Sequence, residues 1–371
     1  MAIHLKFLTL ALIATVLLAG EVFTATLSPP SKEKKESDAR YSFIATHDEI
    51  VASAKKEGKL RVLASMEPAN IRATTAAFTK KYPFIDVYVQ ETRGTEGAQR
   101  LVLEIQTGAA KEWDAVVVYP DFRSGYTGHL WNVDVLGMAE RGVIKIPSPM
   151  IDQKYRNVFS AHTHFQPTAY NSKVVAPHLV PKNWEDLLRP ELKGRKFSVD
   201  IRPKDLAALV PAWGLEKTLD FARKIAAQQP IWVRGSRALS YLTTGEIPIV
   251  VGPNFSTVKR AQVKDRAGLL QYVILEPVPV RFGNAQAILA TSQNRHAALL
   301  WLEWLASPEA QKIVDEHEPF ASSVHVPGGM VERELRGKKL SIVDWENYHD
   351  VERSEAKIVE AYGFPKAEAA K

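Results

Sequence analysis

Cysteine is absent from the 371 residues of the chain. Disulfide bonds, thiolate metal ligands, a cysteine nucleophile and a lipid-modified cysteine are therefore all excluded. The chain also has no G-x-S-x-G nucleophile elbow, no G-x-x-x-x-G-K phosphate loop and no H-E-x-x-H zinc motif. Acidic pairs occur, but nothing in their spacing places them together. These absences predict a protein that is not an enzyme and that holds no cofactor.

No strong excess of one charge is present. The chain has 48 Lys and Arg against 42 Asp and Glu, a formal net charge of +6. This mild charge fits an anionic ligand no better than ordinary solubility. A dense basic stripe with interleaved aromatic residues is also missing, so we expect no nucleic-acid partner. The length is sufficient for two lobes of ordinary size.

A hydrophobic run long enough to span a bilayer comfortably is missing as well. The run Phe7–Ala19 has the length of the apolar core of a signal peptide. We therefore expect a signal peptide over residues 1–25, a disordered linker over the polar residues 26–40, and a periplasmic protein. An uncleaved leader that tethers the chain to the membrane stays open. Glu21 stands where a lipobox needs cysteine, and Phe23 fits poorly before a cut after Ala25.

Apolar periodicity predicts alternating strands and helices in the first half of the folded chain. Strands are expected at Leu60–Ala64, Ile85–Val89 and Asp114–Tyr119, and helices at Ile71–Tyr82 and Ala98–Thr107. An earlier helix is expected over Asp48–Lys56, with Asp48 as its cap, and Asn70 is expected to cap the second helix. Short β-α-β-α-β connections favour a parallel sheet covered by helices on both faces.

Three loops follow these strands, at Ser65–Asn70, Thr92–Gly97 and Tyr119–Arg123. The carboxyl ends of parallel strands meet at one edge of a sheet, and ligands bind there in open α/β folds. We therefore expect the three loops to converge on one rim.

A second unit of the same kind covers Ile231–Arg260. A short strand at Ile231–Val233 leads to a helix that ends at Gly245, then to a buried strand at Ile247–Val251 and a helix from about Phe255. Two helix N-termini, near Ser236 and near Asn254–Ser256, then lie at one sheet edge. Exposed N–H groups and the helix dipole make such an edge an anion site.

Two extended stretches, Val158–Ser172 and Arg281–Ala290, are interpreted as crossings between the lobes. The first contains His162 and His164, which share one face of a strand. Such a pair can bind a metal, but two strand histidines without a metal are the commoner case. No metal site is predicted.

Several segments together resemble a known family. They are the strand DAVVVY at Asp114–Tyr119, PKNWEDLL at Pro181–Leu188, LKGRK at Leu192–Lys196 and LEWLASPEAQ at Leu302–Gln311. In this order they are similar to the extracellular solute-binding proteins of ABC importers, most closely to the ferric-iron-binding type. The resemblance covers about Tyr41 to Gly328.

The resemblance implies a two-lobed α/β Venus flytrap, each lobe a mainly parallel sheet flanked by helices. Lobe 1 is expected over residues 41–165 and 283–325, lobe 2 over 166–282, and a helical tail over 326–371. It further implies a monomer that captures a small solute between its lobes and delivers it to an ABC permease in the inner membrane. A sensor of the same fold is an alternative.

One position departs from the ferric-binding pattern. In that type an adjacent pair of tyrosines follows the strand equivalent to Ile247–Val251, whereas this chain has Asn254 and Phe255 nearby. Iron would therefore need other oxygen donors, such as Glu67, Glu96 or Tyr119. Arginine guanidinium groups, which can donate two parallel hydrogen bonds, and helix N-termini suit a small organic anion instead. The predicted ligand-binding residues are Glu67, Arg93, Thr95, Tyr119, Ser236, Arg237, Asn254, Phe255 and Ser256.

Overall fold

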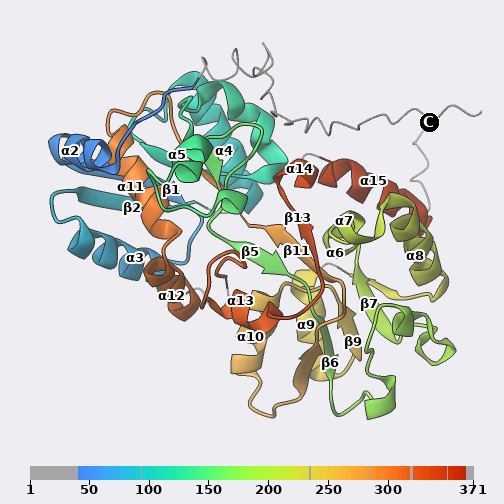
Figure 1. Cartoon of the computed structure of the whole chain (residues 1–371). Coiled ribbons are helices and arrows are strands. Elements are labelled where there is room, and N and C mark those ends of the chain that lie inside the picture. Colours follow the sequence, from blue (N-terminus) through green and yellow to red (C-terminus); the bar gives the residue numbers. More distant parts are fainter. Residues whose placement is uncertain are drawn as a thin grey trace, which may run out of the picture. The chain divides into compact units, whose positions relative to one another are not determined.

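The computed structural model describes residues 41–92, 94–233, 235–283, 285–317, 321–348 and 350–364, without the side chains of residues 95, 120, 121, 235 and 236 (Figure 1). The expected signal peptide and linker lie outside these ranges. Within them, no helix combines the length and the apolar character needed to cross a membrane.

The first sheet follows the predicted β-α-β-α-β pattern. Its strand order is β2-β1-β3-β12-β4, with bounds Asp86–Glu91, Lys59–Ala64, Ala115–Val118, Ala285–Ile288 and Val158–Phe159. β1 pairs in parallel with β2 and β3, whereas β12 runs antiparallel to β3 and β4. Leu60 and Val62 of β1 pack into one core cluster and Leu63 into another. The sheet is therefore covered on both faces, as the buried strands predict.

Helices cover this sheet. They are α2 (His47–Glu57), α3 (Pro68–Lys81), α4 (Gly94–Thr107), α5 (Val135–Glu140), α11 (Arg295–Leu305) and α12 (Pro308–His317). Trp301 and Trp304 of α11 are fully buried, and their ring centroids lie 5.2 and 5.7 Å from that of Phe78 in α3. Aromatic packing of this kind dominates the energetics of a core.

Both predicted helix caps are wrong. Thr46 caps α2, because its hydroxyl accepts a hydrogen bond from the backbone N–H of Glu49 at 3.2 Å. Asn70 lies inside α3, buried, with its Oδ1 accepting from the hydroxyl of Thr74 at 2.8 Å. α3 begins at Pro68, whose fixed φ suits the first turn of a helix. α4 also begins earlier than predicted, at Gly94, so Glu96 lies in its first turn.

The second sheet has the order β10-β6-β9-β7-β8, with bounds Leu270–Val273, Thr168–Asn171, Ile249–Val251, Phe197–Asp200 and Ile231–Val233. Its helices are α6 (Lys204–Ala207), α7 (Val210–Trp213), α8 (Leu215–Ala227), α9 (Gly235–Thr244) and α10 (Phe255–Lys264). The single helix expected over Pro203–Trp213 is divided in two. Pro211 has no N–H to donate to the preceding turn, so a continuous helix is disfavoured there.

A third sheet, which we call the crossing sheet, has the order β13-β11-β5 (Figure 1). Its bounds are Leu340–Val343, Val278–Phe282 and Thr163–Phe165. Along the chain, β5 follows β4 of the first sheet and precedes β6 of the second. Likewise, β11 follows β10 of the second sheet and precedes β12 of the first. The two predicted crossings are therefore confirmed, although the return crossing begins earlier, at Val278.

Residues 326–371, expected to be helical, also contain a strand. β13 pairs in parallel with β11 and covers its open edge. The helices of this segment are α13 (Met330–Leu335), α14 (Trp345–Tyr348) and α15 (Val351–Tyr362). α15 packs on α8, and its buried Ile358 and Tyr362 join the core of the second sheet. Short 3-10 turns cover Pro120–Gly125, Thr127–His129, Ser148–Met150, Pro177–Leu179, Glu185–Leu188 and Pro190–Leu192.

Candidate functional site

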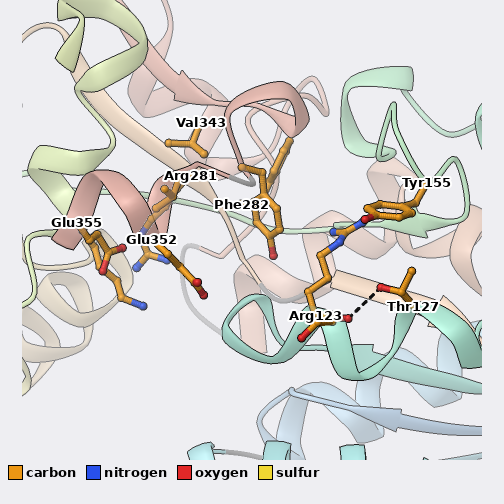
Figure 2. Close-up of a pocket in the computed structure, with 12 residues that line it drawn as sticks. Arg123, Thr127, Tyr155, Arg281, Phe282, Val343, Glu352 and Glu355 are labelled. Carbon is orange, nitrogen blue, oxygen red and sulfur yellow. Dashed lines mark hydrogen bonds between the residues drawn. The ribbon is translucent and has the colours of Figure 1, made fainter. Parts of the chain in front are cut away.

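A cavity of about 510 Å³ opens beside the crossing sheet, and we call it the central cavity (Figure 2). Its walls come from the turn after β3, from α6, from β11 and β13, and from α14 and α15. The lining residues are Arg123, Ser124, Thr127, Tyr155, Lys204, Arg281, Phe282, Val343, Tyr348, Val351, Glu352 and Glu355. Elements of the first sheet, the second sheet and the C-terminal segment therefore all contribute to one site.

Arg123 provides the best-defined polar group of this cavity. Its guanidinium carbon lies 4.6 Å from the ring centroid of Tyr155 and 5.6 Å from those of Trp345 and Tyr348. Nη2 donates to the buried carboxylate of Asp152, and the side chain is 11% exposed. Nε and Nη1 are buried and have no hydrogen-bond partner within the described ranges. A desolvated guanidinium with unused donors favours an incoming anion, because the bond formed is charge-assisted.

The opposite end of the central cavity carries both signs of charge. In Figure 2, Arg281, Glu352 and Glu355 lie together on one side of Phe282, and Arg123 and Tyr155 lie on the other. Arg281 donates from Nη2 to Oδ1 of the predicted site residue Asn254 at 3.0 Å. This end can thus contact hydroxyl or amino groups as well as anionic oxygens.

A smaller cavity of about 220 Å³ adjoins the first, and we call it the side cavity. The two share Lys204 and Arg281 in their walls. The side cavity is otherwise lined by Gln166, Asp200, Arg202, Asp205, Gly252, Pro253, Asn254 and Thr257. The strand-to-helix turn before α10, predicted from the sequence as a ligand edge, therefore does line a cavity.

Asp205 is the most buried charged group of the side cavity, at 2% exposure. Burial raises its pKa to about 7, and the charge of Asp200 acts in the same direction. The backbone N–H groups of Leu206 and Asp205 lower the pKa of this carboxylate in part, although neither meets the geometry of a hydrogen bond to it. Neither carboxylate oxygen has a hydrogen-bond partner within the described residues.

The predicted residues at the start of α10 have different environments. Asn254 lines the side cavity. Phe255 is buried at 1% exposure, and its ring stacks on that of Phe165 with centroids 4.3 Å apart. Ser256 is also buried. Only Asn254, among the predicted residues whose side chains are described, lines either of the two cavities.

Two of the three loops predicted to form the rim of the first sheet are in contact. The hydroxyl of Tyr119 donates to the backbone carbonyl of Thr92 at 2.8 Å in a buried contact, so the second and third loops meet. The carboxylate of Glu67 lies 3.2 Å from Nη1 of Arg260 in α10. Arg237 is exposed on α9. Arg93 and the side chains of Thr95 and Ser236 lie outside the described residues.

Sequence reasoning missed the side chains that line the central cavity. Arg123 ends one of the three predicted loops, so a signal for it existed, but no pattern distinguished it from a solvated loop arginine. Glu352 and Glu355 lie on α15, in the segment predicted to be a helical tail. Their proximity to Arg281 depends on where that segment packs, and the local sequence carries no signal for this.

His162 lies just before β5 of the crossing sheet, and His164 lies within this strand. Nδ1 of His162 lies 2.7 Å from the backbone carbonyl of Ala321. Burial, followed by the charge of Arg281, lowers the pKa of His164 to about 3, so this side chain is neutral. Within the described ranges, no group of three or more His, Asp or Glu residues is arranged to hold a metal ion.

Residues 162–350, just over half of the chain, match the family of bacterial extracellular solute-binding proteins. The chain belongs to this family. Its structure is similar to the FutA protein of Trichodesmium solved with iron and citrate, at TM-score 0.65 and 19% identity, covering 83% of this chain and 100% of that one. It is also similar to the ferric binding protein of Campylobacter jejuni, at TM-score 0.62 and 19% identity, covering 82% and 100%.

An uncharacterized protein of Haemophilus influenzae is 24% identical over 285 residues, 71% of this chain and 77% of that protein. The comparisons confirm the predicted family and the two-lobed α/β fold. The family and these structural neighbours are binding proteins rather than enzymes. At these identities the structural similarity establishes the fold and leaves the ligand to be argued from the site.

Proposed function

We propose that this protein captures a small organic anion in the central cavity and delivers it, as a periplasmic monomer, to an ABC permease of the inner membrane. The observation that carries the proposal is Arg123, whose buried Nε and Nη1 have no hydrogen-bond partner among the described residues and which lines the cavity. The rings of Tyr155 and Tyr348 lie 4.6 and 5.6 Å from its guanidinium carbon, at distances that suit cation–π contacts. The donor is thus pre-organised for a carboxylate or a phosphonate.

Ferric iron is the second candidate. The phenols of Tyr155 and Tyr348 and the carboxylates of Glu352 and Glu355 are oxygen donors that line the same cavity. The guanidinium of Arg123 opposes a bare trivalent cation there, because it lies 4.6 Å from the ring centroid of Tyr155. An iron–citrate complex, which presents anionic oxygens, fits these surroundings better.

Titration calorimetry on the full-length protein tests the proposal. The panel contains citrate, succinate, phosphonoacetate, a sulfonate, and ferric iron with and without citrate. Arg123→Gln is expected to weaken anion binding by about 10- to 100-fold, since a hydrogen bond to a charged group contributes about 1.5–3 kcal/mol. Arg223→Gln, on the exposed face of α8, is the matched control. Equal affinities of the two variants would place the ligand elsewhere.

The titrations with ferric iron distinguish the two candidate ligands. Binding of free ferric iron that survives Arg123→Gln would exclude the organic anion as the physiological ligand. Binding of citrate alone, lost in Arg123→Gln, supports the proposal. Delivery is tested in cells that lack the gene: uptake of the labelled anion should fall, whereas a sensor of the same fold would leave uptake intact.

A further inference from the structure

The side cavity adjoins the central cavity. Lys204 of α6 and Arg281 of β11 line both spaces. A ligand that contacts Arg123 at one end of the central cavity and reaches Arg281 at the other therefore meets the opening of the side cavity. The proposed function gives no role to this second space.

The carboxylate of Asp205 lies against the backbone of Gly252 in the wall of the side cavity. Gly252 has φ +73°, and a Cβ at this residue would lie 2.1 Å from Oδ2 of Asp205. Only glycine allows both this backbone conformation and this close approach. The turn before α10 is therefore shaped around the carboxylate, which any other residue at position 252 would displace.

Within the described residues, no group makes a hydrogen bond of good geometry to this carboxylate. Asp205 is 2% exposed and both of its oxygens lack a hydrogen-bond partner within the described residues. A buried polar group left unpaired destabilises the fold, so a group retained in this state is better explained by a partner that arrives later. In its ionised form the carboxylate only accepts hydrogen bonds, so the partner of ionised Asp205 is a donor.

We propose that Asp205 accepts a hydrogen bond from a hydroxyl or ammonium group of the ligand, so that the transported solute is an organic anion that also carries a donor. This inference rests on the proposed function and specifies its ligand: the anionic group lies at Arg123, and the donor group extends past Lys204 and Arg281 to Asp205. An anion of similar size without a donor leaves the buried carboxylate unpaired and binds less tightly.

Matched probes test the inference. Succinate, malate and aspartate share one dicarboxylate skeleton and differ by a hydrogen, a hydroxyl and an ammonium group at one carbon. Ethyl phosphate, 2-hydroxyethyl phosphate and phosphoethanolamine repeat the comparison on a phosphate. In the full-length protein, one donor-bearing member of a series is expected to bind at least tenfold tighter than its donor-free member. Asp205→Asn should reduce that difference, because the amide keeps one acceptor oxygen but loses the negative charge and gains an NH₂ donor.

Asp220→Asn, an exposed carboxylate on α8, is the control and should preserve the discrimination. If Asp205→Asn does not melt cooperatively, Asp205→Ser replaces it in the same titrations. Equal weakening of all members by the Asp205 variant, or no weakening of any, would overturn the inference while leaving anion binding at Arg123 in place. A parent protein that binds no member of either series would overturn the proposed function and this inference together.

Discussion

The carboxylate of Glu67 lies 3.2 Å from the guanidinium of Arg260, which connects the loop after β1 to helix α10. Both side chains are partly exposed, at 34% and 43%. Glu67→Gln is expected to weaken ligand binding by less than about fivefold, because exposed ion pairs contribute about 0–1 kcal/mol. The effect should vanish in 1 M salt, where charges are screened within about 3 Å. A larger loss that persists in high salt would show that Glu67 contacts the ligand directly.

Stability should depend on pH through Asp205. Its pKa rises from 3.8 to about 7 in the folded protein. Below pH 4 the carboxyl is protonated in both the folded and the unfolded protein. Between pH 4 and 7 only the unfolded protein releases the proton, so the free energy of unfolding falls as the pH rises. Above pH 7 both forms are ionised and the loss of stability is constant. Each pKa unit corresponds to about 1.4 kcal/mol, which sets an upper limit of about 4 kcal/mol. Asp205→Asn should therefore melt higher than the parent at pH 8 and equally at pH 4.

Calorimetric melting at pH 4, 6 and 8 measures this difference. Asp220→Asn should change the melting temperature only slightly at every pH, because its exposed ion pair with Lys224 contributes about 0–1 kcal/mol. A variant of Asp205 that is destabilised at pH 8 would mean that the carboxylate has a structural partner.

Phe255, which the sequence predicts as a ligand-binding residue, stacks on Phe165 in the core. Phe255→Ala is therefore expected to lower the free energy of unfolding by about 3–5 kcal/mol, the usual loss for a buried phenylalanine. Urea unfolding measures this loss, and the half-exposed Phe43 provides the control through Phe43→Ala.

Phe255→Tyr should not create iron binding, because the added hydroxyl would be buried. A visible phenolate–iron absorption band in that variant would contradict this placement.

The C-terminal helix is expected to be essential for the second sheet. The ring centroids of Tyr362 and Trp232 lie 4.7 Å apart, and Ile358 is fully buried. Ile358→Ala should cost about 2–5 kcal/mol in unfolding free energy, whereas the adjacent exposed change Lys357→Ala should have little effect. Similar unfolding curves for the two variants would show that α15 packs only loosely on this core.

Much of the fold was accessible from periodicity. Apolar runs such as Ala115–Val118 and the stops at Gly58 and Gly245 mark local conformations that depend on neighbours in the chain. The predicted elements, the parallel pairing of β1, β2 and β3 and the two crossings agree with the structure. Each of the two large sheets is mixed rather than mainly parallel, because β12 pairs antiparallel with β3 and β4, and β6 pairs antiparallel with β9 and β10. The wrong predictions concern details that residue propensities do not determine. Thr46 rather than Asp48 caps α2, and Pro211 divides a helix that was expected to be continuous.

The site was much less accessible. Arg123, Asp205, Arg281 and Glu355 lie far apart in the chain and on different elements, and each alone reads as an ordinary surface charge. Burial changes their chemistry: the same carboxylate that would be solvated in a loop becomes an unpaired acceptor in the side cavity. Burial depends on which elements pack together, and the sequence near each residue does not encode it.

The sequence by itself thus determined the family, the alternation of strands and helices and the absence of cysteine chemistry, because these depend on residue type and short-range order. The tertiary structure alone decided which charges face the central cavity, that Phe255 belongs to the core, and that α15 completes the site. Those outcomes depend on long-range packing, in which residues more than two hundred positions apart, such as Arg123 and Tyr348, come within 5.6 Å of each other.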